Sequence, residues 1–263
     1  MLEIKYITHT FRRSAVKTWI ALFFFCVVSF FMGVVQVAGD SSYPIELYGH
    51  LELKDHVHSI YHSSPIIADV FTFGLVGSLF LYLFIFYTST DQVPLRLILR
   101  RFLWIFSIMY LLRMITLNLT IIPISKQDCE LASAHSVSQI FLRALMIPSG
   151  KPTCSGQIFS GHTTALIVST FFLDNYVQIK SKILRWLYLA VLYSVALVGI
   201  FFIIIGRYHY TVDTVVAVLI AYGVYNTYHS IIIISQENLF FHLPNPLFRR
   251  PVIKTVQWMD SDK

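Results

Sequence analysis

Charged side chains are scarce in this chain of 263 residues. Asp, Glu, Lys and Arg make up 13% of it, whereas hydrophobic residues make up 56%. This composition excludes an ordinary soluble domain of this length and fits a polytopic membrane protein. The net charge of +6 does not indicate nucleic-acid binding, because the basic residues gather beside hydrophobic segments and no soluble recognition fold carries them.

Cysteine is also rare, with three in the whole chain. Cys26 lies inside the first hydrophobic segment, whereas Cys129 and Cys154 share one long connection. In an oxidising secretory compartment these two can form a disulfide, and two free thiols are the alternative. A cleavable signal peptide is not evident, because the first apolar stretch has no small-residue cleavage site after a short core. We expect that stretch to be a retained anchor.

Six hydrophobic segments are long enough, or nearly long enough, to cross a bilayer, which takes about 20 apolar residues. They are Trp19–Ala38, Val70–Tyr87, Phe102–Ile122, Gly161–Val177, Leu184–Ile205 and Val212–Ile234. We therefore predict an all-α protein with one six-span membrane domain at 19–234. A short N-terminal segment at 1–18 precedes it, and an irregular tail at 235–263 follows it. Ser138–Met146, in the third-to-fourth connection, is expected to form a short surface helix.

The distribution of basic residues predicts the orientation. Fourteen Lys and Arg residues fall on the side of the two termini, five fall on the other side, and Arg113 lies within a span. Cytoplasmic loops carry the excess of Lys and Arg, so both termini are expected to be cytoplasmic. The remaining connections are then lumenal or extracellular.

Two short histidine motifs lie at that lumenal side, each where a hydrophobic segment begins. They are Ser160-Gly161-His162-Thr163 and the run from His209 to Asp213. Helix N-termini present free N–H groups and a positive dipole end, which suit a phosphate. Asp213 is one helical turn from His209 and can orient its ring. The alternatives are a capped helix with an incidental histidine and a His–Asp pair that only anchors a helix.

A second group of residues is predicted to bind phosphate. Arg113 lies inside a span, where a guanidinium is costly, and a bidentate contact with a lipid phosphate is the preferred reason for it. Snorkelling or a structural ion pair is the alternative. Ser160, Gly161, Arg207 and Tyr210 complete the predicted set, although interfacial anchoring explains Arg207 equally well. His56 and His58 fit solvated loop histidines better than metal ligands.

The motifs together resemble those of the phosphatidic acid phosphatase type 2 (PAP2) superfamily, and in particular its sphingomyelin synthase branch. The resembling stretches are Cys154 to Thr163, with its Ser-Gly-His-Thr, and His209-Tyr210-Thr211-Val212-Asp213. A third motif resembles Arg100-Arg101-Phe102 through Tyr110, Arg113, Thr116 and Thr120 to Pro123, and Pro65 and Asp69 weakly resemble a fourth. Gly156 stands where these synthases usually carry an acid, which puts the choice of head group in doubt.

The resemblance implies a PAP2-like helical bundle that moves a phospho-head group between lipids, with catalytic residues His162, His209 and Asp213. His209 would attack phosphatidylcholine, and His162 would protonate the departing diacylglycerol and then deprotonate ceramide. No cofactor or metal is implied, and a homo-oligomer is compatible with it. The Golgi, the endoplasmic reticulum and the plasma membrane are the expected locations. The alternatives are a lipid phosphate phosphatase or head-group hydrolase, and a non-catalytic lipid sensor.

Overall fold

Helices are the regular secondary structure of the residues that the computed structural model describes. These residues are 2–48, 51, 53–58, 63–86, 95–125, 129–147, 153–154, 158–236 and 246–260. Within them no strand occurs, and the predicted all-α fold is confirmed. The helices are α1 (Leu2–Ser41), α2 (Ile45–Tyr48), α3 (Pro65–Phe86), α4 (Leu95–Leu119), α5 (Val137–Met146), α6 (Gly161–Tyr176), α7 (Lys182–Ile205), α8 (Thr211–Gln236) and α9 (Pro246–Asp260).

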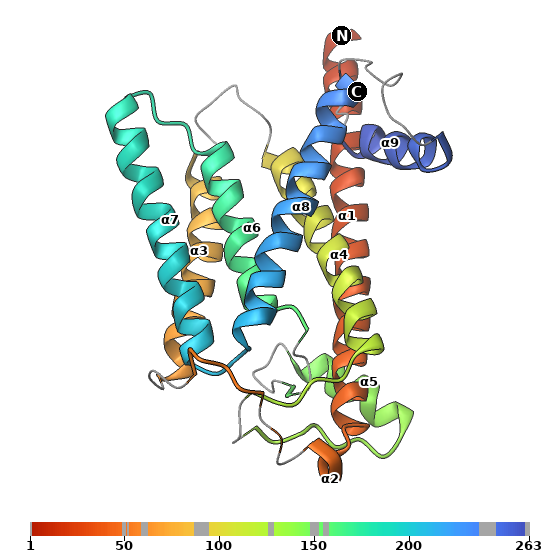
Figure 1. Cartoon of the computed structure of the whole chain (residues 1–263). Helices are drawn as coiled ribbons and strands as arrows, with labels where there is room; N and C mark the ends of the chain where they lie inside the picture. Colours follow the sequence, from red (N-terminus) through yellow and green to blue (C-terminus); the bar gives the residue numbers. More distant parts are fainter. Residues whose placement is uncertain are drawn as a thin grey trace.

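Five of these helices are long and apolar enough to cross a membrane. Their candidate spans are Ser14–Ser41, Ile66–Ile85, Leu95–Leu119, Lys182–Ile205 and Thr211–Ile234. α6 has 16 residues, and at 1.5 Å per residue it is about 24 Å long, shorter than the hydrocarbon core. It nevertheless runs within the bundle, beside α3, α7 and α8 (Figure 1). The predicted six spans therefore correspond to five long helices and one short one.

The bundle is organised around α6 and α8. α1 packs against α4 and α5, whereas α3 packs against α6 and α7. α8 contacts α4, α6 and α7, so it joins the two groups of helices (Figure 1). Aromatic rings fill the joint: the ring of Phe102 lies 5.3 Å from that of Phe172, which lies 5.5 Å from that of Tyr225. Such edge-to-face pairs fix the relative rotation of three helices.

α4 begins seven residues earlier than predicted, at Leu95 instead of Phe102. The prediction excluded the first two turns because they carry arginines. One of these, Arg101, donates from Nε and Nη2 to the carboxylate of Asp260 at 2.6 and 2.8 Å. A paired guanidinium with an apolar stem is compatible with a helix end at the membrane surface, so the helix continues through it.

The tail also differs from the prediction, because residues Pro246–Asp260 form α9 instead of an irregular extension. A proline is well tolerated at the first helical position, where its missing N–H is not needed. Ile253, Val256 and Met259 recur at helical spacing and are buried, so one face of α9 packs against the bundle. This amphipathic packing outweighs the helix-breaking effect of Pro251.

The N-termini of α6 and α8 lie at the same end of the bundle. That end is opposite the one where α1 begins and where α9 lies across the other helices (Figure 1). α2 and α5, the latter being the predicted surface helix, lie near the end where α6 and α8 begin, together with the connections at that end. The end where α6 and α8 begin therefore carries the long connections, and the opposite end carries both chain termini. That the latter faces the cytoplasm stays a prediction from charge.

Candidate functional site

The start of α6 is fixed by a helix cap. The hydroxyl of Ser160 accepts a hydrogen bond from the N–H of Thr163 at 3.1 Å, and Ser160 is completely buried. The predicted capping role is observed, and the substrate-binding role of Ser160 stays a prediction. Gly161 follows as the first helical residue, and a Cβ added there would lie 2.6 Å from Nη1 of Arg113. Only glycine leaves room for the guanidinium against the helix start.

His162, in the first turn of α6, pairs with a carboxylate from another helix. Its Nε2 lies 3.2 Å from Oδ1 of Asp69, which is in the first turns of α3. The other oxygen of Asp69 accepts a hydrogen bond from the hydroxyl of Tyr208 at 2.9 Å. The rings of Tyr208 and His162 stack with centroids 4.9 Å apart. The carboxylate and the ring together fix the orientation of the imidazole.

This first pair is reachable from outside the protein. The side chains of His162 and Asp69 are 30% and 34% exposed. Burial and the bond to Asp69 both raise the pKa of the Tyr208 phenol, so the phenol stays protonated and remains a donor. His162 can therefore exchange a proton with a group that enters from the bilayer or the aqueous side.

The second pair, His209 and Asp213, is buried. Their side chains are 6% and 3% exposed, and Nδ1 of His209 lies 3.9 Å from Oδ2 of Asp213. α8 begins at Thr211, so His209 precedes the helix instead of lying on its face as the sequence argument required. Asp213 also accepts a hydrogen bond from the N–H of Tyr210 at 3.2 Å, which holds the carboxylate beside the histidine.

Direct contact joins the two helix starts that carry these pairs. The N–H of Ser160 donates to the carbonyl oxygen of Asp213 at 3.3 Å. The guanidinium of Arg113, a buried residue of α4, lies against Gly161 and interacts electrostatically with Asp213. Two histidines, two carboxylates and one guanidinium thus surround the junction of α6 and α8. The predicted convergence of the two motifs is observed.

A tight helix ending positions His209. Beyond Ile205 the N–H of Arg207 donates to the carbonyl of Ile204, and that of Tyr208 donates to the carbonyl of Ile203, at 2.9 and 3.2 Å. This pattern is a Schellman motif, which requires a left-handed residue at its turn. Arg207 occupies that position with a φ of 55°. The residue is therefore held by its backbone and supports the turn into α8.

Tyr210 and the backbone of Arg207 bind protein groups in the connections. The carbonyl of Arg207 accepts from the hydroxyl of Ser125 at 2.8 Å. The phenol of Tyr210 donates to the carbonyl of Ile124 at 3.4 Å and accepts from the N–H of Leu53 at 3.3 Å. Tyr210 is only 2% exposed. Both residues thus hold the connections over the start of α8. Tyr210 offers no free surface to a lipid, whereas the phosphate-binding role of the Arg207 guanidinium stays a prediction.

His58 is buried, although the sequence favoured a solvated loop histidine. It is 5% exposed, its ring stacks on that of Tyr210 at 5.3 Å, and its Nε2 lies 3.2 Å from the carbonyl oxygen of His209. The described residues contain no group of three metal-ligating side chains that includes it. His58 therefore supports the backbone that presents the second catalytic candidate.

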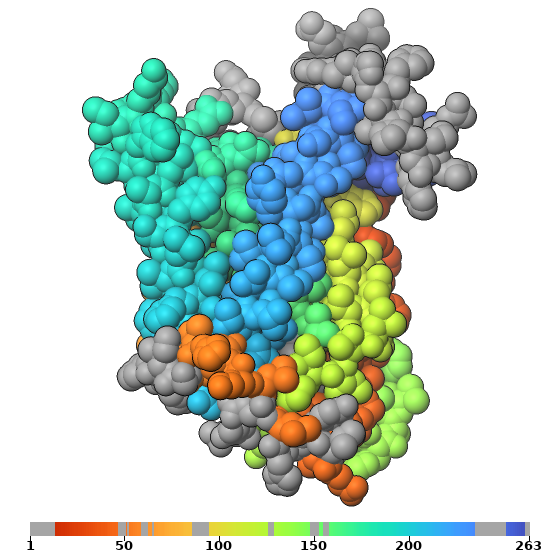
Figure 2. Space-filling model, in the orientation of Figure 1, coloured from red at the N-terminus to blue at the C-terminus, as the bar shows by residue number. Residues whose placement is uncertain are grey.

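Asp55 caps α8 from the same segment. Its carboxylate accepts hydrogen bonds from the N–H and the hydroxyl of Thr211 at 2.7 and 2.9 Å. Burial raises the pKa of Asp55, but these bonds and one from the N–H of Val57 outweigh it and lower the pKa below its ordinary value. A carboxylate at a helix N-terminus is favourable for the same electrostatic reason. In Figure 2 this orange segment lies over the start of α8.

The long connection before α6 is anchored at two points. Cys129 and Cys154 are joined by a disulfide, with Cα atoms 5.8 Å apart. The N–H of Cys154 donates to both carboxylate oxygens of Asp40, at the end of α1, at 3.0 Å. Gly156, on which the head-group argument depends, lies outside the described residues. The anchored connection holds the segment that leads into Ser160.

Sequence reasoning left out Asp55, interpreted His58 as a solvated loop histidine and left Asp69 undecided. Asp69 is 93 positions from His162 in the chain, so no local spacing links them. A signal existed, because a carboxylate at the start of an otherwise apolar span is costly unless it serves a polar site. Asp55 and His58 lie in a connection without periodicity, and no such signal marks them.

Comparison with known proteins identifies the region that contains both motifs. Residues 153–230 match the family model of the PAP2 superfamily C-terminal domain. The chain is 30% identical over 148 residues to phosphatidylcholine:ceramide cholinephosphotransferase 1 of Caenorhabditis elegans, which covers 51% of this chain and 31% of that protein. Over 141 residues it is 30% identical to the human protein of the same name, covering 50% and 33%.

A second type of relative is equally similar. The chain is 29% identical over 150 residues to phosphatidylcholine:ceramide cholinephosphotransferase 2 of Rattus norvegicus, covering 53% of this chain and 40% of that protein. These matches confirm the resemblance that the motifs indicated. The chain spans between 31% and 40% of the length of the three relatives.

Proposed function

We propose that this protein is an integral-membrane phosphotransferase that moves a phospho-head group from a glycerophospholipid to ceramide. Phosphocholine is the proposed head group, since phosphatidylcholine and ceramide are the substrates in the names of its relatives. The observation that carries the proposal is the meeting of two carboxylate–histidine pairs and one guanidinium where α6 and α8 begin. This set contains a nucleophile, an acid/base and a phosphate ligand.

The first half-reaction uses both pairs. Nδ1 of His209 faces Asp213, which leaves Nε2 as the nucleophile toward phosphorus. As the P–N bond forms, the P–O bond to diacylglycerol breaks, and the departing oxygen takes a proton from His162. Asp213 stabilises the positive charge that develops on the ring of His209. The products are phosphohistidine and diacylglycerol.

The second half-reaction reverses the proton movement. His162, held by Asp69 through Nε2, accepts the proton of the primary hydroxyl of ceramide. The ceramide oxygen attacks phosphorus, the P–N bond breaks, and His209 is regenerated. A correctly placed acid/base contributes about 10²–10⁴-fold to such a step. The greater exposure of His162 suits a group that must meet two different lipids in turn.

Arg113 is proposed to hold the phosphate between the two histidines. Its guanidinium lies against Gly161 at the positive end of α6, so the helix dipole and the side chain act on the same anion. A guanidinium binds two phosphate oxygens at once, which orients the phosphorus toward its nucleophile. Buried donors of this kind act more strongly than exposed ones, because water does not screen them.

The transfer is tested with purified protein in lipid vesicles that contain phosphatidylcholine labelled in the head group. We expect label to appear in a sphingolipid only when ceramide is present. His209→Ala and His162→Ala should each abolish transfer, while His135→Ala, at an exposed position in the connection, should leave it unchanged. Release of water-soluble phosphocholine regardless of ceramide identifies a hydrolase instead, and no turnover with any head group rejects both enzymatic functions.

A further inference from the structure

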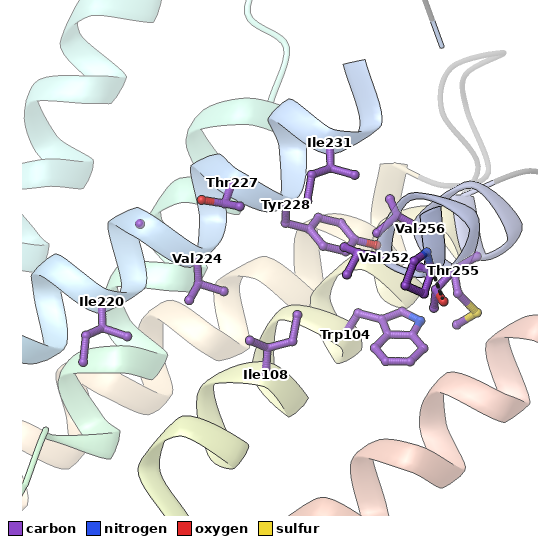
Figure 3. A pocket seen from close by; sticks show the side chains of 13 residues that line it. Trp104, Ile108, Ile220, Val224, Thr227, Tyr228, Ile231, Val252, Thr255 and Val256 are labelled. Atoms are coloured by element: carbon purple, nitrogen blue, oxygen red, sulfur yellow. Dashed lines mark hydrogen bonds between the residues drawn. The ribbon is translucent and has the colours of Figure 1, made fainter. Parts of the chain in front are cut away.

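A large apolar groove lies in the half of the bundle away from His162 and His209. It has a volume of about 650 Å³ and is lined by side chains of α4, α8 and α9. Trp104 and Ile108 form its α4 wall, and Val224 and Tyr228 lie on its α8 wall (Figure 3). α9 closes the third side with residues such as Val256. Since α4 and α8 contain candidate membrane spans, an apolar groove between them is suited to the hydrocarbon of a bilayer.

The position of the groove along α8 limits which lipid can occupy it. Its lining on this helix runs from Ile220 to Ile231. At 1.5 Å per residue these positions lie about 10 and 27 Å beyond Asp213. Each leaflet contributes about 15 Å to the hydrocarbon core. A lipid whose phosphate meets His209 therefore reaches only the first turn of the groove, whereas a lipid of the opposite leaflet covers the rest of its length.

The third wall is held in place by ion pairing. Asp260, the last residue of α9, accepts two hydrogen bonds from Arg101 of α4. Arg101 also donates from Nη1 to the hydroxyl of Tyr176 on α6 at 2.8 Å. α9 is therefore bonded to α4 directly and to α6 through Arg101, and these bonds hold the third wall of the groove in place. A preformed site avoids the cost of ordering its walls on binding.

One polar atom in this apolar surface also points to a ligand. Nε1 of Trp104 is buried and has no hydrogen-bond partner among the residues that the structure describes. In Figure 3 the nitrogen lies on the side of the indole ring toward α9. A buried donor without a partner is unfavourable. An ester carbonyl of a glycerophospholipid is an acceptor that this N–H can meet.

The charge of α9 indicates the head group. Its sequence contains two arginines and one lysine against one acid, Asp260, which is already paired with Arg101. Lys254 is exposed, one residue before Thr255 in the groove lining. Basic residues beside a leaflet attract anionic lipids by about 1 kcal/mol each.

We propose that this groove binds one acyl chain of an anionic glycerophospholipid from the leaflet on the α9 side. This lipid is separate from the two reacting lipids and does not depend on the proposed transfer reaction. Its chain lies along α8, its ester carbonyl meets Trp104, and its head group lies beside Lys254.

Fluorescence of Trp104 tests the site directly in the full-length protein. Replacing the other tryptophans, Trp19, Trp186 and Trp258, with phenylalanine leaves one reporter in the groove wall. The protein is placed in nanodiscs that contain either phosphatidylserine or phosphatidylcholine with brominated acyl chains, at equal mole fraction. We expect brominated phosphatidylserine to reach half-maximal quenching at about fivefold lower mole fraction, the ratio that corresponds to about 1 kcal/mol. Equal quenching by the two lipids would refute the anionic preference.

Matched variants separate the groove from general contact with lipid. A side chain added at Gly223 enters open space in the groove, and one added at Gly77 enters open space on α3. Gly223→Phe should lower the quenching of Trp104 to the level produced by lipid that contacts the protein outside the groove. Gly77→Phe should not change this quenching. Lys254→Glu should remove the preference for phosphatidylserine, and Lys182→Glu, exposed at the same end on α7, should retain it. Quenching that is unaffected by Gly223→Phe would overturn the proposed site.

Discussion

Replacing Gly161 with alanine tests the proposed position of Arg113 with the smallest change in the site. The added Cβ would lie 2.6 Å from Nη1 of Arg113, whereas ordinary contacts begin at 3.4 Å. The guanidinium must therefore move by at least the difference, about 0.8 Å. A misplacement of about 1 Å can lower a rate about 10²-fold. We expect the rate of head-group transfer to fall by about 10–10²-fold for the same reason.

Stability should respond differently from activity. The clash involves the far end of a flexible side chain, and alanine has a higher helix propensity than glycine. The melting temperature of Gly161→Ala should therefore equal or slightly exceed that of the wild type. Gly77→Ala, which meets no atom within 4 Å, serves as the control and should keep full activity. Wild-type turnover by Gly161→Ala would show that Arg113 does not hold the phosphate from this position.

Three further predictions follow from other contacts. Asp69→Asn should lower the rate of transfer by on the order of 10²-fold, because His162 loses its charged partner. Asp69→Glu should restore part of that rate. Equal rates for Asp69→Asn and the wild type would exclude the pair from catalysis. Gly199→Ala should lower the free energy of unfolding by about 1–3 kcal/mol, since its Cβ would lie 2.5 Å from a side-chain atom of α6. Gly77→Ala should leave this free energy unchanged, and thermal unfolding of the two variants makes the comparison. Asp55→Asn should destabilise the protein above pH 3.8, and its difference from wild type should shrink as the pH falls through the lowered pKa, because the carboxylate stabilises the fold only when ionised. A pH-independent difference would contradict that role.

The sequence was sufficient to predict the membrane helices and the place where the two motifs meet. Hydrophobic length marks spans reliably, and six alternating spans put the starts of the helices at Gly161 and Thr211 at one end. The sequence was insufficient wherever a contact joins segments without a shared period. The carboxylate of Asp69 reaches its histidine from another helix, and that of Asp55 caps α8 from a connection.

α9 was missed for a different reason. Its prolines indicated an irregular tail, yet Pro246 occupies the first helical position and Pro251 lies within the helix. The decisive contributions are tertiary: burial of Met259 against the bundle and pairing of Asp260 with Arg101. Neither is visible from local propensity, because both depend on where the first turns of α4 lie in space.

The covalent intermediate is the most direct test of the proposed mechanism. The protein is incubated with phosphatidylcholine labelled at phosphorus, without ceramide, quenched in alkali to preserve phosphohistidine, digested and mapped by mass spectrometry. We expect the label on the peptide that contains His209, its absence in His209→Ala, and its transfer to sphingolipid when ceramide is added. Label on the peptide that contains His162, or turnover without any labelled peptide, would contradict the assignment of His209 as nucleophile.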